Sequence, residues 1–434
     1  MRKFGTRTLA IGVVAGLVSV FALAGVGGAA TAGSDQGVTD DSVTIGFIYS
    51  KSGVASATSG DSDVGCKARV GRENAKGGVN GRKIEVEYFD DQSSGANLTG
   101  AQDLVQNKHV FMIVNDSAFG FLTYRWLLDH GVPLIGGGYD GTYYGDPGNE
   151  NIISGFGNAA PVNGVSNDLG AKIMKAKGVK KSAALGYGVS PSSSEAAKSF
   201  NKYAAPSQGI KPVYTNTTVD FGSTDVGPLV LGIKNAGADG AWYAMNGNTN
   251  LAIAQGLKQS GVNMKVNLMA TGYGQDLLDQ PGSNQLGPGV IFSQGFQPVE
   301  LQNKATKQLM SDLKKYAGHD GGVPDFGIYT GYMNCDLAIQ GIKQQGKNLD
   351  QTTFSNDMRK LGKVNPANLN CQPIDISAET FGKPAPTICQ YAMYVKDGKF
   401  TLFKPKGTGK DFWEGKLIGK SVTEATTTTT APAQ

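Results

Sequence analysis

The fold is decided by residues 43–91, which read VTIGFIYSKSGVASATSGDSDVGCKARVGRENAKGGVNGRKIEVEYFDD. An apolar strand at 43–49 runs into a small polar loop at 50–53. A helical segment then ends near residue 76, a glycine turn follows, and a strand at 83–88 alternates charged with apolar residues. This order predicts a βαβ unit. In such units ligands bind at the loops that follow the strands, so the loop at 50–53 is a candidate site.

A leader precedes this unit. Arg2, Lys3 and Arg7 are followed by an apolar run at 9–26 and then by Ala-Thr-Ala at 30–32. A basic start, an apolar middle and small residues at the end indicate a cleaved secretory signal at 1–32. The alternative is a retained membrane anchor, since the run is near the minimum span of about 18 residues. We therefore expect a secreted, periplasmic or cell-envelope protein of a bacterium.

Charge and length limit the function classes. The chain has 40 Lys and Arg against 36 Asp and Glu, and three of those cations lie in the leader. The rest is close to neutral, which argues against a nucleic-acid partner. The 434 residues exceed one ordinary core, so two domains are expected.

Four cysteines suit an oxidising compartment. Cys371 and Cys389 flank a loop with proline and glycine, and we predict a disulfide between them. Cys66 and Cys335 lie in predicted helices and would pair only if those helices touch; otherwise they are free buried thiols. With no C-x-x-C and scattered histidines, the sequence predicts neither a metal site nor a cofactor.

The rest of the chain alternates strands and helices. The continuously apolar strand at 110–114 and the strand at 43–49 are predicted at the centre of a sheet, with 83–88 outside them. A helix is predicted over 162–177, and Ser192 with Glu195 is predicted to form a capping box. Further strands are predicted at 182–185, around 213, at 241–244, 266–269, 391–395 and 400–403, the last two joined at Asp397-Gly398, and further helices at 301–316 and 329–345.

Residues 74–83, NAKGGVNGRK, followed by Asp90 and Asp91, resemble the signature region of bacterial leucine/isoleucine/valine-type solute-binding proteins. The general pattern continues to about residue 403. The resemblance implies an α/β fold of the type I periplasmic binding class, with two Rossmann-like lobes that have parallel-sheet cores and are joined by a three-crossing hinge. It also implies a small-molecule ligand held between the lobes and an ABC transporter permease as partner. We expect a monomer.

The expected organisation follows from that resemblance. The first lobe is predicted at 41–152 plus 294–365 and the second at 153–293 plus 366–410. A Thr-rich tail at 422–434 is predicted to be disordered. The cleft loops are predicted at 50–53, 115–119 and 136–141 in the first lobe and at 187–194, 245–249 and 271–274 in the second.

Amino-acid-binding members of the family use small hydroxyl and backbone groups of the first lobe for the carboxylate, and an acidic residue of the second for the ammonium. Here residues 271–274 read TGYG, and the next acid is Asp276. We therefore predict an uncharged or acidic organic ligand, with amino acids, organic acids and aromatic compounds as the candidate classes. The predicted ligand-binding residues are Ser52, Ser117, Ala118, Phe119, Gly138, Tyr139, Asp140, Tyr187, Asn246 and Tyr273.

Each candidate also has a purely structural interpretation. Ser52 would cap a helix, Asp140 would brace a glycine turn, and Tyr139 and Tyr273 would shield a sheet edge. No nucleophile–base pair is recognisable, so no catalytic residue and no enzyme activity is predicted. Three alternatives remain open, namely a sensor subunit for a membrane receptor, an extracellular enzyme on the same scaffold, and a structural cell-envelope protein.

Overall fold

The computed structural model describes residues 35–136, 148–155, 165–280, 282–283, 286–381, 383 and 387–419. The predicted leader and the Thr-rich tail lie outside these residues. Among the described helices, none has both the length and the apolar character that crossing a bilayer requires.

The first sheet is all parallel. Its strands are β1 (Ser42–Tyr49), β2 (Lys83–Asp90), β3 (Met112–Asn115), β4 (Leu134–Gly136) and β5 (Ile152–Ile153), in the order β2-β1-β3-β4-β5. The prediction that the strands near 43 and 110 are central and that near 83 is at the edge is therefore confirmed. The central strands are buried on both faces, which is why their sequences are continuously apolar.

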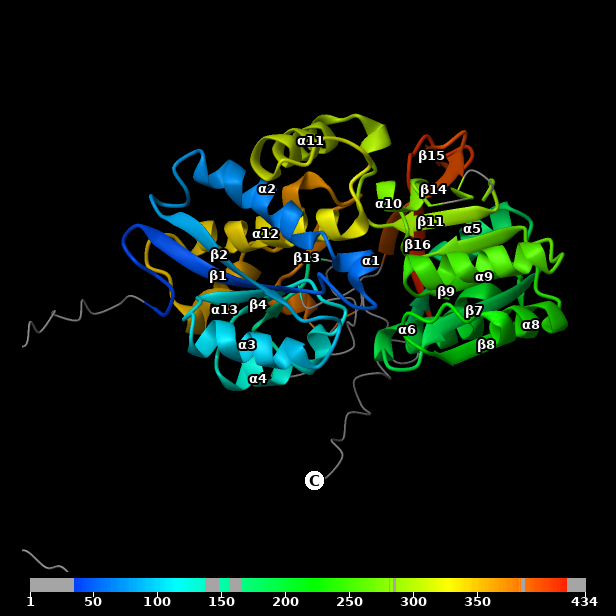
Figure 1. Ribbon diagram of the computed structural model, residues 1–434, viewed down its shortest axis with the longest axis horizontal. Helices are drawn as coiled ribbons and strands as arrows, with labels where there is room; N and C mark the ends of the chain where they lie inside the picture. The colour runs from blue at the N-terminus through cyan, green and yellow to red at the C-terminus, as the bar shows by residue number, and fades with distance from the viewer. Residues whose placement is uncertain are drawn as a thin grey trace, which may run out of the picture. The chain divides into compact units, whose positions relative to one another are not determined.

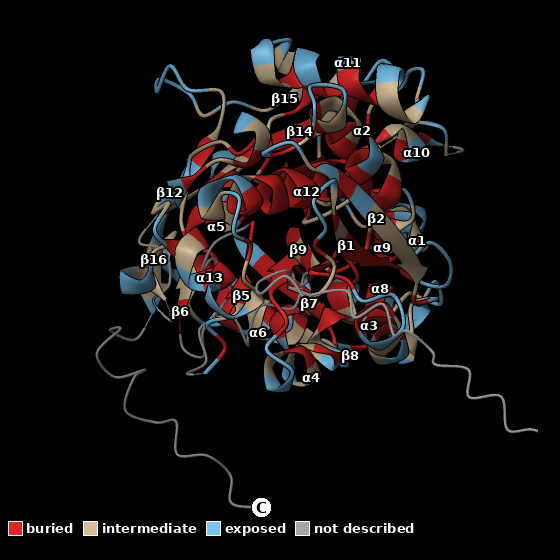
Figure 2. Ribbon diagram, turned by 90° about the vertical axis from the view of Figure 1, so that its left-hand side faces the viewer, coloured by how far each residue is buried: buried red, intermediate tan, exposed pale blue. Residues whose placement is uncertain are grey.

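Helices cover both faces of this sheet (Figure 1). They are α1 (Ser56–Ser59), α2 (Ser62–Asn74), α3 (Ala96–Gln106), α4 (Tyr124–Asp129), α11 (Lys304–Ala317), α12 (Phe326–Gln345) and α13 (Gln351–Arg359). Figure 2 shows α12 buried along most of its length, packed among the other elements. Helices α2 and α12, which are far apart in the sequence, therefore belong to the same helical layer of the first sheet.

The packing of α2 on α12 is unusually close. A side chain at Gly65 would lie 2.0 Å from the carbonyl oxygen of Ile328, and one at Gly331 would lie 1.9 Å from that of Ser62. Only glycine allows the two backbones to approach this far. The contact brings Cys66 and Cys335 together, and they form a disulfide across it.

The second sheet has nine strands. They are β6 (Val165–Asn167), β7 (Lys181–Tyr187), β8 (Lys211–Val219), β9 (Gly240–Ala244), β10 (Val266–Met269), β11 (Val290–Gln294), β14 (Thr387–Lys396), β15 (Lys399–Leu402) and β16 (Trp413–Gly419). The core β8-β7-β9-β10-β11 is parallel, and β14, β15, β16 and β6 add antiparallel pairs. β14 and β15 form the predicted hairpin, with positive φ at Asp397 and Gly398 as a two-residue turn requires.

Helices pack on this sheet as well, and the period of two along β7 shows how. Ala183 and Leu185 face the cluster that includes α8 (Gly227–Ala236) and α9 (Gly247–Gln259). Ala184, between them, faces the cluster that includes α5 (Leu169–Ala176) and α6 (Pro191–Ser199). The remaining short elements are α7 (Ala205–Ser207), α10 (Gln275–Leu278), β12 (Lys363–Val364) and β13 (Ile374–Asp375).

Two sequence predictions in this region are wrong. The helix predicted over 162–177 begins only at Leu169, because Val165–Asn167 pairs with β16 as strand β6, while 162–164 lie outside the described residues. The capping box at Ser192 is replaced by Ser190, whose side chain accepts a hydrogen bond from the Ser193 N–H. Pro191 explains the shift, since proline fits the first position of a helix.

The chain passes between the sheets after β5, after β11 and between β13 and β14. The second passage pairs with the segment just before β13: Phe296 bridges to Asn370, and the Gln297 N–H donates to the Leu369 carbonyl at 2.7 Å. Cys371, before β13, and Cys389, on β14, form the predicted disulfide, which therefore spans the third passage. The fold class is therefore confirmed as α/β with two parallel-sheet cores and three crossings.

Candidate ligand-binding site

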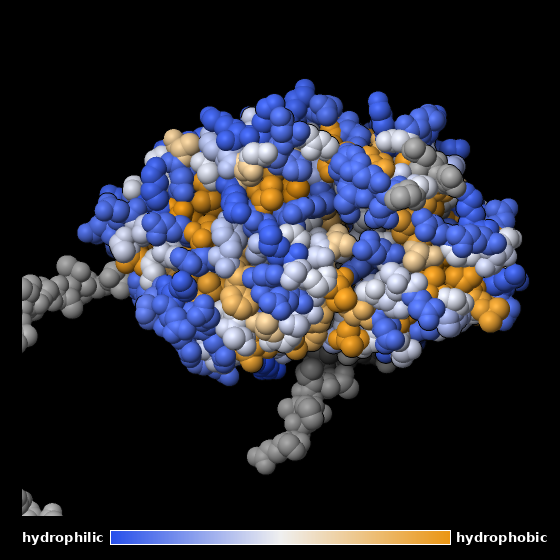
Figure 3. All heavy atoms as spheres, viewed as in Figure 1, coloured by the Kyte–Doolittle hydropathy of each residue, from blue (hydrophilic) through white to orange (hydrophobic). Residues whose placement is uncertain are grey.

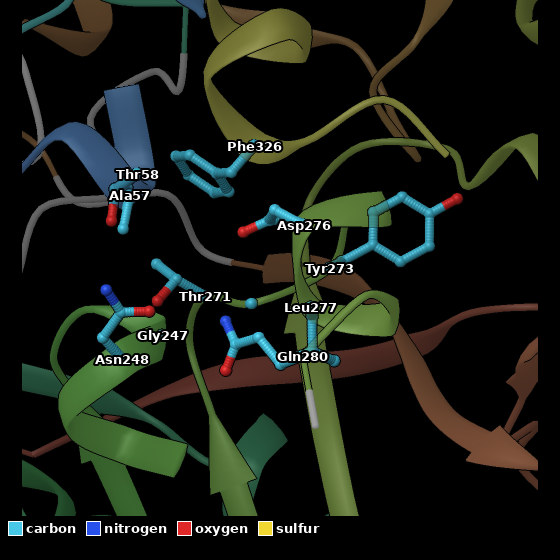
Figure 4. Close-up of a pocket in the computed structure, with 11 residues that line it drawn as sticks. Ala57, Thr58, Gly247, Asn248, Thr271, Tyr273, Asp276, Leu277, Gln280 and Phe326 are labelled. Atoms are coloured by element: carbon cyan, nitrogen blue, oxygen red, sulfur yellow. The ribbon is translucent and has the colours of Figure 1, made fainter. Parts of the chain in front are cut away.

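A pocket lies where α1, the first turn of α9, the loop after β10 and the start of α12 meet (Figure 4). The enclosed space is about 10 Å³, room for about one water molecule, and the hollow around it is open to solvent. The lining residues are Ala57, Thr58, Gly247, Asn248, Thr271, Gly272, Tyr273, Asp276, Leu277, Gln280 and Phe326. Elements of both sheets' layers thus contribute to one concave site, as ligand sites in α/β folds commonly do.

Two glycines allow the loop after β10 to lie against α9. A side chain at Gly247 would come within 3.2 Å of the Gly272 Cα, and Gly272 has a φ of +114°. A side chain at Gly272 would also lie 2.9 Å from the Phe292 ring. The pocket wall therefore depends on glycine at both positions.

The first turn of α9 is uncapped. Asn246 stands at the N-cap in an extended conformation and makes no side-chain capping bond. The first N–H groups of a helix have no partner within the helix. The next two residues, Gly247 and Asn248, line the pocket, so this end of the helix meets it.

Two buried polar groups beside this turn have no hydrogen-bond partner among the described residues. They are the hydroxyl of Thr58, which is 6 % exposed, and the amide nitrogen of Asn246, which is 8 % exposed. Figure 4 shows Thr58 facing the first turn of α9. Buried polar groups are usually paired, so a lone one in a pocket wall indicates a site for a ligand or for water.

Carboxylates gather at the other side of the pocket. Burial raises the pKa of Asp276, and the charges of Asp61 and Asp279 raise it further. Asp325, whose side chain caps α12 by accepting from the Ile328 N–H at 2.8 Å, has its pKa raised to about 7 by burial and by the charges of Asp61 and Asp276. Among the described lining residues none is basic, so the charge of the pocket comes from Asp276.

Ser117 is already engaged within the protein. Its hydroxyl is buried and hydrogen-bonds to the carboxylate of Asp91, which also accepts from Ser50 at 2.7 Å and from Asn97 at 2.8 Å. The Ser117 oxygen in turn accepts from the Phe119 N–H at 3.0 Å. This network holds the loops after β1, β2 and β3 together.

Ser52 does not cap a helix. Its hydroxyl donates to Asp90 at 2.7 Å, and its N–H donates to the same carboxylate at 3.2 Å. Neither Ser52 nor Ser117 is among the residues that line the pocket. Whether either contacts a ligand stays a prediction.

Three aromatic rings form a chain between loops of the two sheets. Phe119, after β3, lies 5.2 Å from Phe221, after β8, and Phe221 lies 4.5 Å from Tyr187, at the end of β7 (ring centroids). Ala118 precedes Phe119 in a partly exposed loop. The Tyr187 hydroxyl donates to Thr249 at 2.9 Å and accepts from the Asn246 N–H at 3.1 Å. Tyr187 therefore supports α9 rather than lining the pocket.

Tyr273 is a pocket residue whose ring lies outside the pocket. The side chain is 2 % exposed and points away in Figure 4. Its hydroxyl donates to Glu300 at 2.6 Å, and its ring lies 4.6 Å from that of Phe400. Gly138, Tyr139 and Asp140 lie outside the described residues, and their role stays a prediction.

Sequence reasoning missed the pocket residues Thr58, Asn248, Gln280 and Phe326, and it noted Asp276 only as the first acid after the loop. No local motif marks Thr58 or Phe326, which lie far apart in the chain and meet only through the packing of α1 near α12. The weak signal for Asn248 was its place in a predicted cleft loop.

The outer surface offers no comparable feature on the face shown in Figure 3, where hydrophobic residues lie scattered among hydrophilic ones. The exposed large hydrophobic residues in the described part of the chain are Val54, Leu122, Val189 and Leu231. Single exposed residues of this kind are ordinary. Among the described residues, no group of three histidines, cysteines or acids could hold a metal.

Comparisons with known proteins agree with this geometry. Residues 42–399 match the model of a family described as periplasmic binding proteins, whereas no curated protein sequence matches the chain. A fatty acid ABC transporter substrate-binding protein from Thermomonospora curvata is similar in structure, with a TM-score of 0.71 and 17% identity over 86% of this chain and 95% of that one. An R. palustris solute-binding protein in complex with benzoate gives 0.65 and 15% over 83% and 95%. A Streptococcus pneumoniae branched-chain amino acid transporter protein in complex with isoleucine gives 0.63 and 18% over 84% and 100%.

Proposed function

The chain belongs to the periplasmic binding protein family, and we propose that it captures a small organic solute outside the cytoplasm and delivers it to an ABC transporter permease. The observation that carries the proposal is the pocket, because Thr58 from the first sheet's side and Gly247, Asn248 and Thr271 from the second sheet's side line the same space. A solute there would contact both parts at once. At the identities given above, the structural relatives support the fold alone, and their ligands only suggest compounds for testing.

We propose that the two sheets are the cores of two lobes that close on the ligand. The boundaries expected at 152/153 and 293/294 fall inside β5 and β11, so we place the first crossing after Ile153 and the second after Gln294. Ile374 and Ile376 still pack with the core of the first sheet. We therefore place the third crossing after residue 376 rather than at 365. The aromatic contact between Phe119 and Phe221 would form on closure and break on opening.

Ligand-linked closure has an energetic requirement. A ligand shifts the two forms only by the difference between its affinities for them, and moving the population from 1:99 to 99:1 needs about 5.5 kcal/mol. A ligand that contacts a single lobe would bind without driving closure. A pocket with walls from both sides supplies the differential contacts.

The test combines binding with scattering. We expect one or more members of a panel of amino acids, aromatic acids and fatty acids to raise the stability of the purified protein, by about 2.7 kcal/mol at 100 times its dissociation constant. Small-angle scattering should then show compaction. A Phe221→Ala variant should close less readily, whereas Phe412→Ala, which loses a ring contact with Tyr391 on β14, should not. Binding without compaction would contradict closure, and failure of every compound to bind would contradict the proposal itself.

Three further statements belong to this proposal. The protein acts as a monomer, it resides in the periplasmic or cell-envelope space, and it does not chemically change its ligand. Turnover of a bound compound would instead favour an extracellular enzyme. Binding to a membrane receptor without transport would favour a sensor subunit.

A further inference from the structure

We propose that the pocket holds its ligand by a carboxylate at the first turn of α9, with the Thr58 hydroxyl as a further donor, and that the ligand also presents a hydrogen-bond donor to Asp276. This inference rests on the proposed function and names the ligand class of the same site. It places the anion on the side of the second sheet, whereas the resemblance in sequence implied the loop of Ser117 on the side of the first.

The first step is the helix end. α9 has 13 residues, its N-cap Asn246 gives no side-chain capping bond, and its first residues line the pocket. Unpaired N–H groups and the positive end of the helix dipole both favour an anion there. A carboxylate would supply the acceptor that the N-cap side chain does not.

The second step is the Thr58 hydroxyl, which is independent of the helix. Thr58 lies on α1 and is only 6 % exposed. Its hydroxyl has no hydrogen-bond partner among the described residues. It lines the pocket and faces the turn of α9 (Figure 4). A ligand oxygen between Thr58 and the α9 turn would satisfy both.

The third step is the state of the alternative site. Ser117 and Ser50 both hydrogen-bond to Asp91, and they lie 3.1 Å apart (Oγ–Oγ). A carboxylate bound at this loop would lie beside the buried Asp91 carboxylate and would compete for the same donors. Because the Ser50 and Ser117 hydroxyls already donate to Asp91, a ligand carboxylate would have to displace that buried carboxylate to use them.

The fourth step is Asp276, which limits which carboxylates fit. Its side chain points into the pocket (Figure 4), and Asp61, Asp279 and Asp325 contribute further negative charge around it. The Asp276 carboxylate accepts from the Leu277 backbone N–H, and a ligand that carries only a carboxylate would meet its negative charge without offering it a donor. A hydroxy acid or an amino acid would place a hydroxyl or ammonium there, and Gln280 is a further polar group of the lining.

The test compares matched carboxylates and carboxamides by isothermal titration. The probes are 4-hydroxybenzoate with 4-hydroxybenzamide, and leucine with leucinamide; benzoate tests the donor requirement. For whichever pair binds, we expect the amide to bind at least about tenfold more weakly, since hydrogen bonds to a charged group are the stronger ones. Benzoate should bind more weakly than 4-hydroxybenzoate if the aromatic pair binds.

The variant arm uses Thr58→Val, which keeps the shape and removes the hydroxyl. We expect about tenfold weaker binding of the carboxylate and an unchanged melting temperature, because the hydroxyl has no protein partner. Ser62→Ala is the matched control: its hydroxyl is also buried and unpartnered among the described residues, but it does not line the pocket, so affinity should not change.

The outcomes are distinguishable. Amides that bind as tightly as carboxylates, or a Thr58→Val variant that binds as tightly as the parent protein, would overturn the anion site while leaving a solute-binding protein intact. Absence of binding by every probe and every compound of the wider panel would overturn the proposed function and this inference with it. The comparison of carboxylate with amide uses the unchanged protein, so it stands even if the variant fails to fold.

Discussion

The carboxylates beside the pocket make stability depend on pH, and Asp325→Asn tests this most directly. Asp325 caps α12 by accepting from the Ile328 N–H at 2.8 Å, and asparagine is an equally good N-cap. The substitution therefore keeps the cap and removes only the charge. It also removes the repulsion from Asp61 and Asp276.

The magnitude follows from the raised pKa. Burial and neighbouring charge raise the pKa of Asp325 from 3.8 to about 7, which is roughly three pKa units. At about 1.36 kcal/mol for each unit, the upper limit is about 4 kcal/mol. Between these two pKa values the folded state keeps a proton that the unfolded state has lost, so this contribution to stability falls as pH rises from about 4 to about 7.

Urea unfolding at pH 5 and pH 8.5 measures this. We expect Asp325→Asn to be more stable than the parent protein at pH 8.5, by up to about 4 kcal/mol, with a smaller difference at pH 5. Asp350→Asn is the control: Asp350 caps α13 and is partly exposed, and the hydrogen bond from Thr352 lowers its pKa, so the sign should reverse. Equal effects of Asp325→Asn at both pH values, or destabilisation at pH 8.5, would refute the reasoning.

Three other predictions concern packing and support of the site. Replacing Cys66 and Cys335 by alanine should lower the free energy of unfolding by up to about 5 kcal/mol, and replacing Cys371 and Cys389 should lower it by up to about 3 kcal/mol. The difference arises because the bridged residues are 269 and 18 apart in sequence, so the first disulfide closes the longer loop. Denaturant unfolding measures both effects, and a larger loss for the second pair would count against the loop-entropy account. Gly331→Ala should lower the free energy of unfolding by at least about 1–3 kcal/mol or prevent folding, since its Cβ would lie 1.9 Å from the Ser62 carbonyl oxygen. Gly95→Ala is the control, because a Cβ there meets open space and should change stability little. Equal melting temperatures of the two variants would disprove this. Tyr187→Phe should destabilise the protein by about 1–3 kcal/mol, because it leaves the buried Asn246 N–H unpaired. It should also weaken ligand binding, because Tyr187 supports the first turn of α9. Unchanged stability in thermal unfolding would contradict this supporting role of Tyr187.

Much of the fold was predictable because its signals are local. The continuous apolar strand at 43–49, the alternating strand at 83–88 and the Asp397-Gly398 turn each carry their own pattern, and each is confirmed. The error at 162–177 has a non-local cause. β6 is a short strand that exists only because β16 pairs with it, and no pattern within residues 165–167 announces that partner.

The pairing of cysteines shows where local signals end. Cys371 and Cys389 are close in sequence, and their bridge was predicted from the loop between them. The sequence does not decide whether Cys66 and Cys335 pair, because their pairing depends on whether α2 and α12 touch. That contact is permitted by Gly65 and Gly331, whose role is visible only when the two helices are in place.

The sequence by itself determined the α/β class, the central or edge position of three strands of the first sheet, and the family, since these follow from periodicity and from one contiguous signature region. Only the tertiary structure decided the pocket. Thr58, Asn248, Asp276 and Phe326 come from four separate elements, and what they share is a common space rather than a pattern. The same holds for Ser117: its sequence position resembles that of a ligand contact, but its hydrogen bonds go to Asp91 because three strand ends converge there. Hydrogen-bond partners and the burial of single polar side chains are properties of three-dimensional neighbours, so neither could be predicted from the order of residues along the chain.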